Sequence, residues 1–153
     1  MTGDATSEVL ASRLGYLLKH ASLRLTETYV QALAPFGLDG RELAVLAVLA
    51  AHDPLSQLEA AGRLGVDRTT MVALVDTLES KDLVVRRRSP HDRRKNVVEL
   101  TPTGRERLPA AERARQEAES RLLAPLSPAD SAALFRALQA LALEPRRADQ
   151  PPG

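Results

Sequence analysis

The chain contains no cysteine. This absence excludes disulfide bonds, metal sites built on thiolates and redox sensing by a thiol. Tryptophan is also absent, and only two phenylalanines and two tyrosines occur among 153 residues. The core must therefore be aliphatic, a composition that suits packed helices better than a β-sandwich. At this length we expect a single domain, 1–153, that buries roughly 70% of the surface exposed by the unfolded chain.

Long apolar runs are missing as well. The longest, residues 43–51, is too short to span a bilayer, and residues 1–4 do not resemble the start of a signal peptide. Three histidines, at positions 20, 52 and 91, give no metal-ligand spacing. No motif places a nucleophile beside a base. We therefore expect a soluble, cytoplasmic protein that is not an enzyme and has no catalytic residue, metal or cofactor.

The net charge of +1 hides an uneven distribution. Residues 83–98 hold six cations against Asp92 alone, so this stretch carries +5 and the rest of the chain −4. Such asymmetry concentrates the attraction for a polyanion on one feature. A charged hairpin tip can also simply be solvated. The residues of the neighbouring helices are therefore needed to distinguish a polyanion-binding feature from a solvated tip.

Apolar periodicity predicts long outer helices at both ends of the chain. The first covers residues 7–33 and is apolar on two faces. Two more cover residues 102–124 and 128–143, and Pro109 is expected to delay or kink the first of these. The polar, proline-rich residues 145–153 are expected to form a disordered tail.

Three short helices are expected between these outer elements. Asp39, Ser56 and Asp67 each carry an N-cap signal, and the helices that they open end near residues 51, 64 and 81. Gly65 supplies the left-handed position between the second and third helices. The fold class is therefore mainly α with a small β-wing, since residues 83–88 and 96–101 read as two short strands around the basic loop.

The helix that follows Asp67 has an unusual exposed face. Helical angles bury Met71, Leu74, Val75 and Leu78 and expose Thr69, Ala73, Asp76 and Ser80, with Arg68, Thr70 and Thr77 on the flanks. Small and hydroxyl-bearing side chains allow a helix to enter a major groove about 12 Å wide, where they meet phosphates and base edges. An ordinary surface helix is usually rich in Lys and Glu, and this face is not.

The helix pair and the basic hairpin together predict a winged helix-turn-helix, with one helix in the major groove of DNA and the wing in the minor groove. The residues expected to bind DNA are Ser56, Gln57, Arg68, Thr69, Thr70, Ala73, Thr77, Arg86, Arg88, Asp92, Arg93, Arg94 and Lys95.

Four stretches, 64–79, 83–87, 92–94 and 98–104, strongly resemble the MarR (multiple antibiotic resistance regulator) family. The pattern D-R-R followed by L-T-x-x-G is specific beside such a helix, and the strong match covers about a third of the chain. One departure is Lys81-Asp82, where many members carry Gly. Asp82 tolerates a left-handed backbone, so the fold is not in doubt.

The resemblance implies an obligate homodimer that reads a pseudo-palindromic operator as a sequence-specific regulator, expected to be a repressor. Residues 7–34 and 102–143 would form the dimer interface, and residues 39–101 the DNA-binding lobe. By the same resemblance Arg94 would enter the minor groove, with Asp92 holding its guanidinium in place.

The resemblance also implies a small anionic or phenolic effector. Candidate ligand residues are Arg13, Tyr16, His20 and Arg24, which also fit as interface or solvent residues. Two other functions stay open. The winged helix could be a protein-docking module with its basic hairpin on an acidic partner, or an architectural DNA binder without sequence preference. The dependence of DNA binding on salt and on sequence separates these from an operator-specific regulator.

Overall fold

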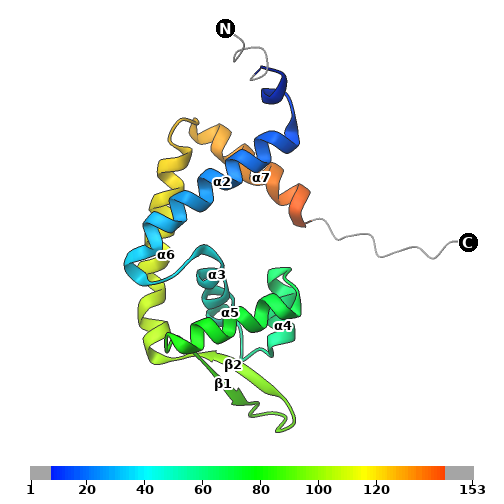
Figure 1. Cartoon of the computed structure of the whole chain (residues 1–153), viewed down its shortest axis with the longest axis vertical. Coiled ribbons are helices and arrows are strands. Elements are labelled where there is room, and N and C mark those ends of the chain that lie inside the picture. The colour runs from blue at the N-terminus through cyan, green and yellow to red at the C-terminus, as the bar shows by residue number, and fades with distance from the viewer. Residues whose placement is uncertain (1–7, 144–153) are drawn as a thin grey trace, which may run out of the picture. The chain divides into compact units, whose positions relative to one another are not determined.

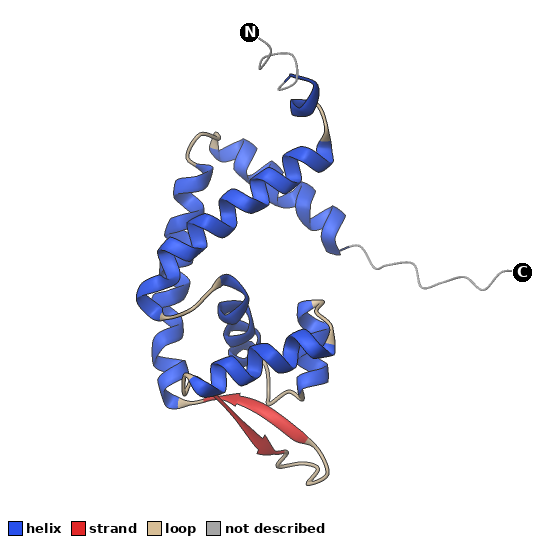
Figure 2. Ribbon diagram, in the orientation of Figure 1, coloured by secondary structure: helices blue, strands red, loops and turns tan. Residues whose placement is uncertain are grey.

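The computed structural model describes residues 8–143, so Ser7 and the predicted tail at 145–153 lie outside the described residues. The chain divides into two compact units, residues 1–119 and 120–153. The first holds most of the helices and the only sheet of the described residues, a two-stranded antiparallel one (Figures 1 and 2). The predicted mainly α fold with a small β-wing is confirmed.

The first helix is shorter than predicted. Residues 8–11 are helical, the chain breaks at Ser12 and Arg13, and α2 then runs over Leu14–Leu33. The Ser12 hydroxyl donates to the carbonyl of Val9 at 2.9 Å, and Arg13 has an extended backbone. A serine that bonds the preceding turn competes with the helix. The prediction of an uninterrupted helix is therefore wrong at this point.

The predicted helix ends and caps that follow are confirmed. A 3₁₀ turn over Ala34–Phe36 ends at Gly37, whose φ is +65°. The capping box of Asp39 and Glu42 opens α3, Gly40–Ala51, with both hydrogen bonds made, at 2.8 and 3.0 Å. The Glu42 carboxylate is buried, and Lys81 Nζ pairs with it at 2.8 Å. That ion pair joins the start of α3 to the end of the predicted recognition helix.

The core lies among α3, α4 (Gln57–Leu64), α5 (Arg68–Ser80) and the hairpin of β1 (Val84–Arg88) and β2 (Asn96–Leu100). Strand β1 lies against α5, and β2 lies against α3 and α4 (Figure 1). The core is aliphatic, as expected, and its largest fully buried side chains are Leu33, Leu43, Val45, Leu46, Met71, Val75, Leu78, Leu83 and Val84.

Helix α6, Pro102–Leu123, starts at a cap that also holds the wing. Thr101 Oγ1 accepts from the N–H of Gly104 at 3.0 Å and donates to the carbonyl of Asp82 at 2.6 Å. Asp82 has the left-handed backbone that its side chain was expected to tolerate, with φ +58°. Pro109 lies inside α6 and does not delay it. Because proline has no N–H, the backbone hydrogen bond to the carbonyl of Arg105 is missing at this position.

The second unit contains the end of α6 and α7, Pro128–Leu143. The N–H of Asp130 donates to Ser127 Oγ at 3.1 Å, so Ser127 caps this helix. Within residues 8–143, no helix combines the length and the apolar character needed to cross a membrane.

Candidate nucleic-acid interface

A tight turn joins α4 and α5. Gly65 has φ +65° and ψ +31°, and the N–H of Val66 donates to the carbonyl of Ala61 at 3.1 Å. The capping box of Ser56 and Glu59 opens α4 with hydrogen bonds of 3.1 and 2.8 Å. Hydrogen bonds from the backbone and side chain of Ser56 lower the pKa of Glu59 below its ordinary value. The helix-turn-helix predicted from the capping signals is therefore present.

The hydroxyls of α5 differ in their availability. Thr70 Oγ1 donates to Asp67 at 2.7 Å, and this bond, followed by the one from the Thr70 backbone, lowers the pKa of Asp67. Thr77 Oγ1 donates to the carbonyl of Ala73 at 2.9 Å. Among the described residues, no partner occupies the hydroxyl of Thr69, which is exposed. Thr69 is thus the threonine of this face that can still donate to a phosphate or a base edge.

The two faces of α5 are those that the helical angles predicted. Met71, Val75 and Leu78 are buried and Leu74 is half-buried. The opposite side is open to solvent, and its exposed residues are Arg68, Thr69, Ala73, Asp76, Thr77 and Ser80.

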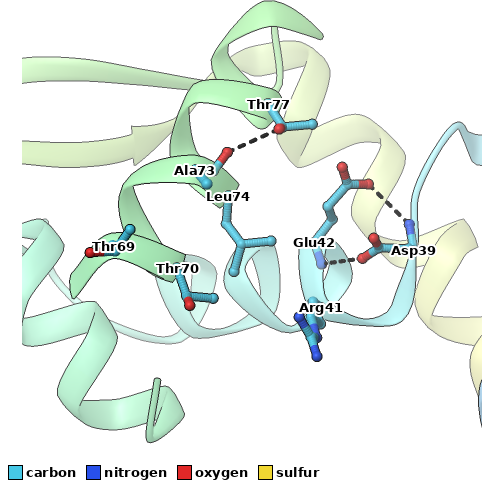
Figure 3. Close-up of a pocket in the computed structure, with 8 residues that line it drawn as sticks. All are labelled: Asp39, Arg41, Glu42, Thr69, Thr70, Ala73, Leu74 and Thr77. Carbon is cyan, nitrogen blue, oxygen red and sulfur yellow. Dashed lines mark hydrogen bonds between the residues drawn. The ribbon is translucent and has the colours of Figure 1, made fainter. Parts of the chain in front are cut away.

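An open groove of about 490 Å³ runs between this helix and the start of α3 (Figure 3). Its lining residues are Asp39, Arg41, Glu42, Thr69, Thr70, Ala73, Leu74 and Thr77. Arg41 is exposed on the α3 side of the groove. Arg41 could not be predicted from the sequence, because it lies before the helix-turn-helix along the chain and no local pattern connects it with α5.

The wing is a regular hairpin with a cationic tip. Its strands pair from Val84 with Leu100 to Arg88 with Asn96. Ser89 closes the loop, donating its N–H to the carbonyl of Lys95 at 2.7 Å. All residues from 91 to 95 are exposed. Within the described part of the chain, no ion pair involves Arg88, Arg93 or Arg94.

The resemblance implied that Asp92 holds the Arg94 guanidinium, and the structure shows a different contact. The Asp92 carboxylate instead accepts a hydrogen bond from the backbone N–H of Arg94 at 3.0 Å. Aspartate side chains commonly bond the backbone two residues later and so shape a turn. Asp92 therefore orients the loop that carries Arg94 and leaves the guanidinium exposed.

Two residues expected to bind DNA, Gln57 and Arg86, contact each other. The Arg86 guanidinium also pairs with two carboxylates of α5, those of Asp76 and Glu79. Glu79 was not predicted as a partner of Arg86. Its i,i+3 spacing from Asp76 places both carboxylates on one side of the helix, a signal that was available.

The four candidate ligand residues lie on α2 or at its cap and are all exposed. The rings of Tyr16 and His20 are 4.1 Å apart between centroids. None of the four, which are Arg13, Tyr16, His20 and Arg24, lines the groove of Figure 3.

Comparisons with known proteins agree with this architecture. A sequence model of the MarR family matches residues 36–95. The putative transcriptional regulatory protein for the hcr operon of Thauera aromatica is 31% identical over 133 residues, which are 86% of this chain and 80% of that protein. The solved structure of the transcriptional repressor CouR bound to a 23-mer DNA duplex is similar with a TM-score of 0.81 and 38% identity, covering 87% of this chain and 94% of that chain.

A second solved structure is that of CouR from Rhodococcus jostii RHA1 bound to p-coumaroyl-CoA. Its TM-score is 0.79 at 28% identity, and the match covers 92% of this chain and 98% of that chain. The similar proteins are named as transcriptional regulators and repressors, which are not enzymes. The chain belongs to the MarR family of transcriptional regulators.

Proposed function

We propose that this regulator binds a pseudo-palindromic operator in double-stranded DNA as a homodimer and represses transcription. Helix α5 would enter the major groove, and Arg94 would enter the adjacent minor groove. The observation that carries the proposal is that a small, hydroxyl-bearing helix face stands beside a wing in which Arg88, Arg93 and Arg94 have no ion-pair partner within the described residues. A narrow minor groove concentrates negative potential and attracts such arginines.

The remaining contacts divide into two kinds. Thr69 and Ala73 face the base edges, where a hydroxyl donates to an acceptor and a methyl meets a thymine methyl. The contacts to the phosphate backbone come from Ser56, Arg68, Arg88, Arg93 and Lys95, whereas the hydroxyls of Thr70 and Thr77 donate within the chain. Phosphate contacts fix the register of the helix, and base contacts select the sequence.

The dimer would bring two such lobes to half-sites about one helical turn apart. Its support is the apolar surface left uncovered on the outer helices of one chain. The exposed side chains of α2 include Leu14, Leu17, Leu18, Leu23 and Val30, and those of α7 include Leu134, Phe135, Leu138, Leu141 and Leu143.

A small anionic or phenolic effector would release the operator. The support is that the transcriptional repressor CouR has been solved both with DNA and with p-coumaroyl-CoA. We propose that Arg13, Tyr16, His20 and Arg24 serve the effector, because they combine cations and rings along α2.

The test is a titration of the protein with duplex DNA at several salt concentrations, with the promoter region of its own gene as the first target. Operator binding should weaken steeply as salt rises and should remain stronger than binding to a scrambled duplex. The same salt dependence without preference for any sequence would indicate an architectural DNA binder. Weak binding at physiological salt would indicate a protein-docking module.

A randomised operator library tests the assignment of the α5 face. Thr69→Ala should change the preferred sequence, because Thr69 has a hydroxyl proton to donate, whereas the Thr70 hydroxyl donates to Asp67. Thr70→Ser, which keeps that donor, is the matched control. An unchanged preferred sequence for Thr69→Ala would mean that this face is wrongly assigned.

A further inference from the structure

Arg86 lies at the junction of three elements. Its Nε and Nη2 donate to Gln57 Oε1, at the start of α4, at 3.1 and 3.0 Å. Nη2 also donates to Asp76 Oδ1 at 2.5 Å, and Nη1 donates to Glu79, both on α5. Four N–H donors of the five on a guanidinium are thus used within the chain. We call these four residues the Arg86 cluster.

The surroundings of Arg86 separate it from the other arginines of the wing. Its side chain is 27% exposed, against 66% for Arg87 on the same strand, whose ion pair with Glu99 is longer, at 3.7 Å. Burial alone would lower the pKa of Arg86, but the hydrogen bonds to Asp76 and Glu79 outweigh it and raise the pKa. The Arg86 guanidinium is therefore charged and satisfied before any DNA is present.

The carboxylates of the cluster lie where a DNA-binding helix can least tolerate them. Asp76 is on the exposed stripe with Thr69 and Ala73, and its side chain is 61% exposed. Glu79 follows one turn later and is 40% exposed. An unpaired negative charge on this stripe, with a second one beside it, would repel the phosphates that the helix must approach. The Arg86 guanidinium pairs with both.

We propose that Arg86 is a positioning residue for DNA binding. It holds β1 and the start of α4 against α5, and it neutralises Asp76 and Glu79 so that the exposed face of α5 can approach the duplex. It does not contact a phosphate, and Gln57 serves it as an acceptor. This inference rests on the proposed function, and it replaces the expectation that Gln57 and Arg86 bind DNA directly.

The first measurement is the dependence of operator affinity on salt for Arg86→Gln, with Arg88→Gln as the matched control on the exposed end of β1. The slope of log K against log salt is negative, and each lost phosphate contact makes it shallower by about 0.9. The slope for a dimer that loses two contacts should therefore be shallower by about 1.8. Arg88→Gln should show this change. Arg86→Gln should weaken binding about tenfold and keep the slope of the parent within 0.5.

The second measurement repeats Arg86→Gln in a background that carries Asp76→Asn and Glu79→Gln. Because no carboxylate is then left unpaired, replacing Arg86 should lower operator affinity by less than about threefold in that background. An equal loss in both backgrounds, a slope that becomes shallower as it does for Arg88→Gln, or an unchanged affinity of the single variant would each overturn the proposal. Rescue of binding counts for the proposal where the single variant and the triple variant have the same thermal stability, because the neutral substitutions would also rescue a loss of fold.

Thermal unfolding of every variant accompanies the titrations. If Arg86→Gln alone does not fold, the triple variant carries the comparison, and binding within threefold of the Asp76→Asn/Glu79→Gln protein supports the proposal. Weaker binding of the triple variant overturns it. Failure of the proposed function would appear elsewhere, as a parent protein that does not prefer the operator over a scrambled duplex.

Discussion

Gly104 is the residue at which one added carbon should be most damaging. A Cβ at this position would lie 2.2 Å from the carbonyl oxygen of Leu83, which already accepts a hydrogen bond from Thr101. The backbone at the start of the wing would have to move, so we expect Gly104→Ala to lower the free energy of unfolding by roughly 1–3 kcal/mol. Chemical denaturation measures this directly.

Gly62 provides the control, because a Cβ there meets nothing within 4 Å. It lies inside α4, where alanine is favoured over glycine by roughly 0.5–1 kcal/mol. Gly62→Ala should therefore raise the free energy of unfolding. Equal effects of the two substitutions on the free energy of unfolding would show that the close approach of α6 to the wing does not contribute to stability.

Asp92 allows the charge and the hydrogen bond of the wing tip to be separated. Asn keeps an oxygen that can accept from the N–H of Arg94, whereas Ala does not. We expect Asp92→Ala to weaken operator binding by about 1 kcal/mol, because the loop loses its internal bond. Asp92→Asn should bind as tightly as the parent or more tightly, since it removes a negative charge near a polyanion. Tighter binding of Asp92→Ala would mean that the wing acts only through its charge.

Arg94 and Arg93 provide a second comparison at the same tip. Arg94→Ala should weaken binding by roughly 1–3 kcal/mol, more than Arg93→Ala, because the hydrogen bond from the Arg94 N–H to Asp92 fixes the turn at Arg94. Fluorescence anisotropy at a single salt concentration compares the two variants with the parent. A larger effect of Arg93→Ala would show that Arg93, and not Arg94, enters the minor groove.

The elements show which features of the fold can be predicted from sequence. Helices opened by local signals, such as Asp39 and Ser56 with their glutamates, begin where predicted, because each signal is a contact between residues three apart. The break at Ser12 was missed because it comes from a hydrogen bond between a side chain and the backbone that leaves the apolar period intact. The Arg86 cluster was missed because its members come from separate elements.

The contact between α2 and α6 leads to a prediction about pH. Tyr29 donates to Glu119, which also pairs with Arg115 at 2.5 Å. Burial, followed by the hydrogen bond to Glu119, raises the pKa of Tyr29 to about 12. Because the pKa in the folded state lies above that in the unfolded state, this stabilisation is complete below pH 10 and is lost as the pH rises from 10 to 12.

Tyr29→Phe removes this titration. The variant should be less stable than the parent at pH 8, and the difference between them should shrink as the pH rises above 10. Thermal unfolding between pH 8 and 11.5 measures the difference, with Tyr16→Phe as the control that retains Tyr29. A constant difference across this range would show that the Tyr29 phenol does not report on the α2–α6 contact.

At the scale of the whole molecule, the outer helices leave apolar surface exposed. No residue of α7 is buried within the single chain, although its mean composition is apolar, and α2 buries only Leu33. Exposed apolar surface of this extent marks an association site in a protein that is otherwise well packed. The proposed homodimer covers it with the same elements of a second copy, as a two-fold interface does.

We therefore expect the parent to be a dimer at micromolar concentration by light scattering, and Leu17→Glu or Leu138→Glu to shift it towards the monomer by placing a charge in the interface. A monomer can occupy only one half-site, so both variants should lose operator affinity by about 10²-fold or more while keeping weak binding to a single half-site. Leu58→Glu is the control, because Leu58 is 71% exposed on α4, outside the proposed interface, and this variant should remain dimeric. Two results would contradict this prediction: a monomeric parent, or monomeric variants that bind the full operator as tightly as the parent. The outer helices would then not form the dimer that binds DNA, and the apolar surfaces of α2 and α7 would bind another partner.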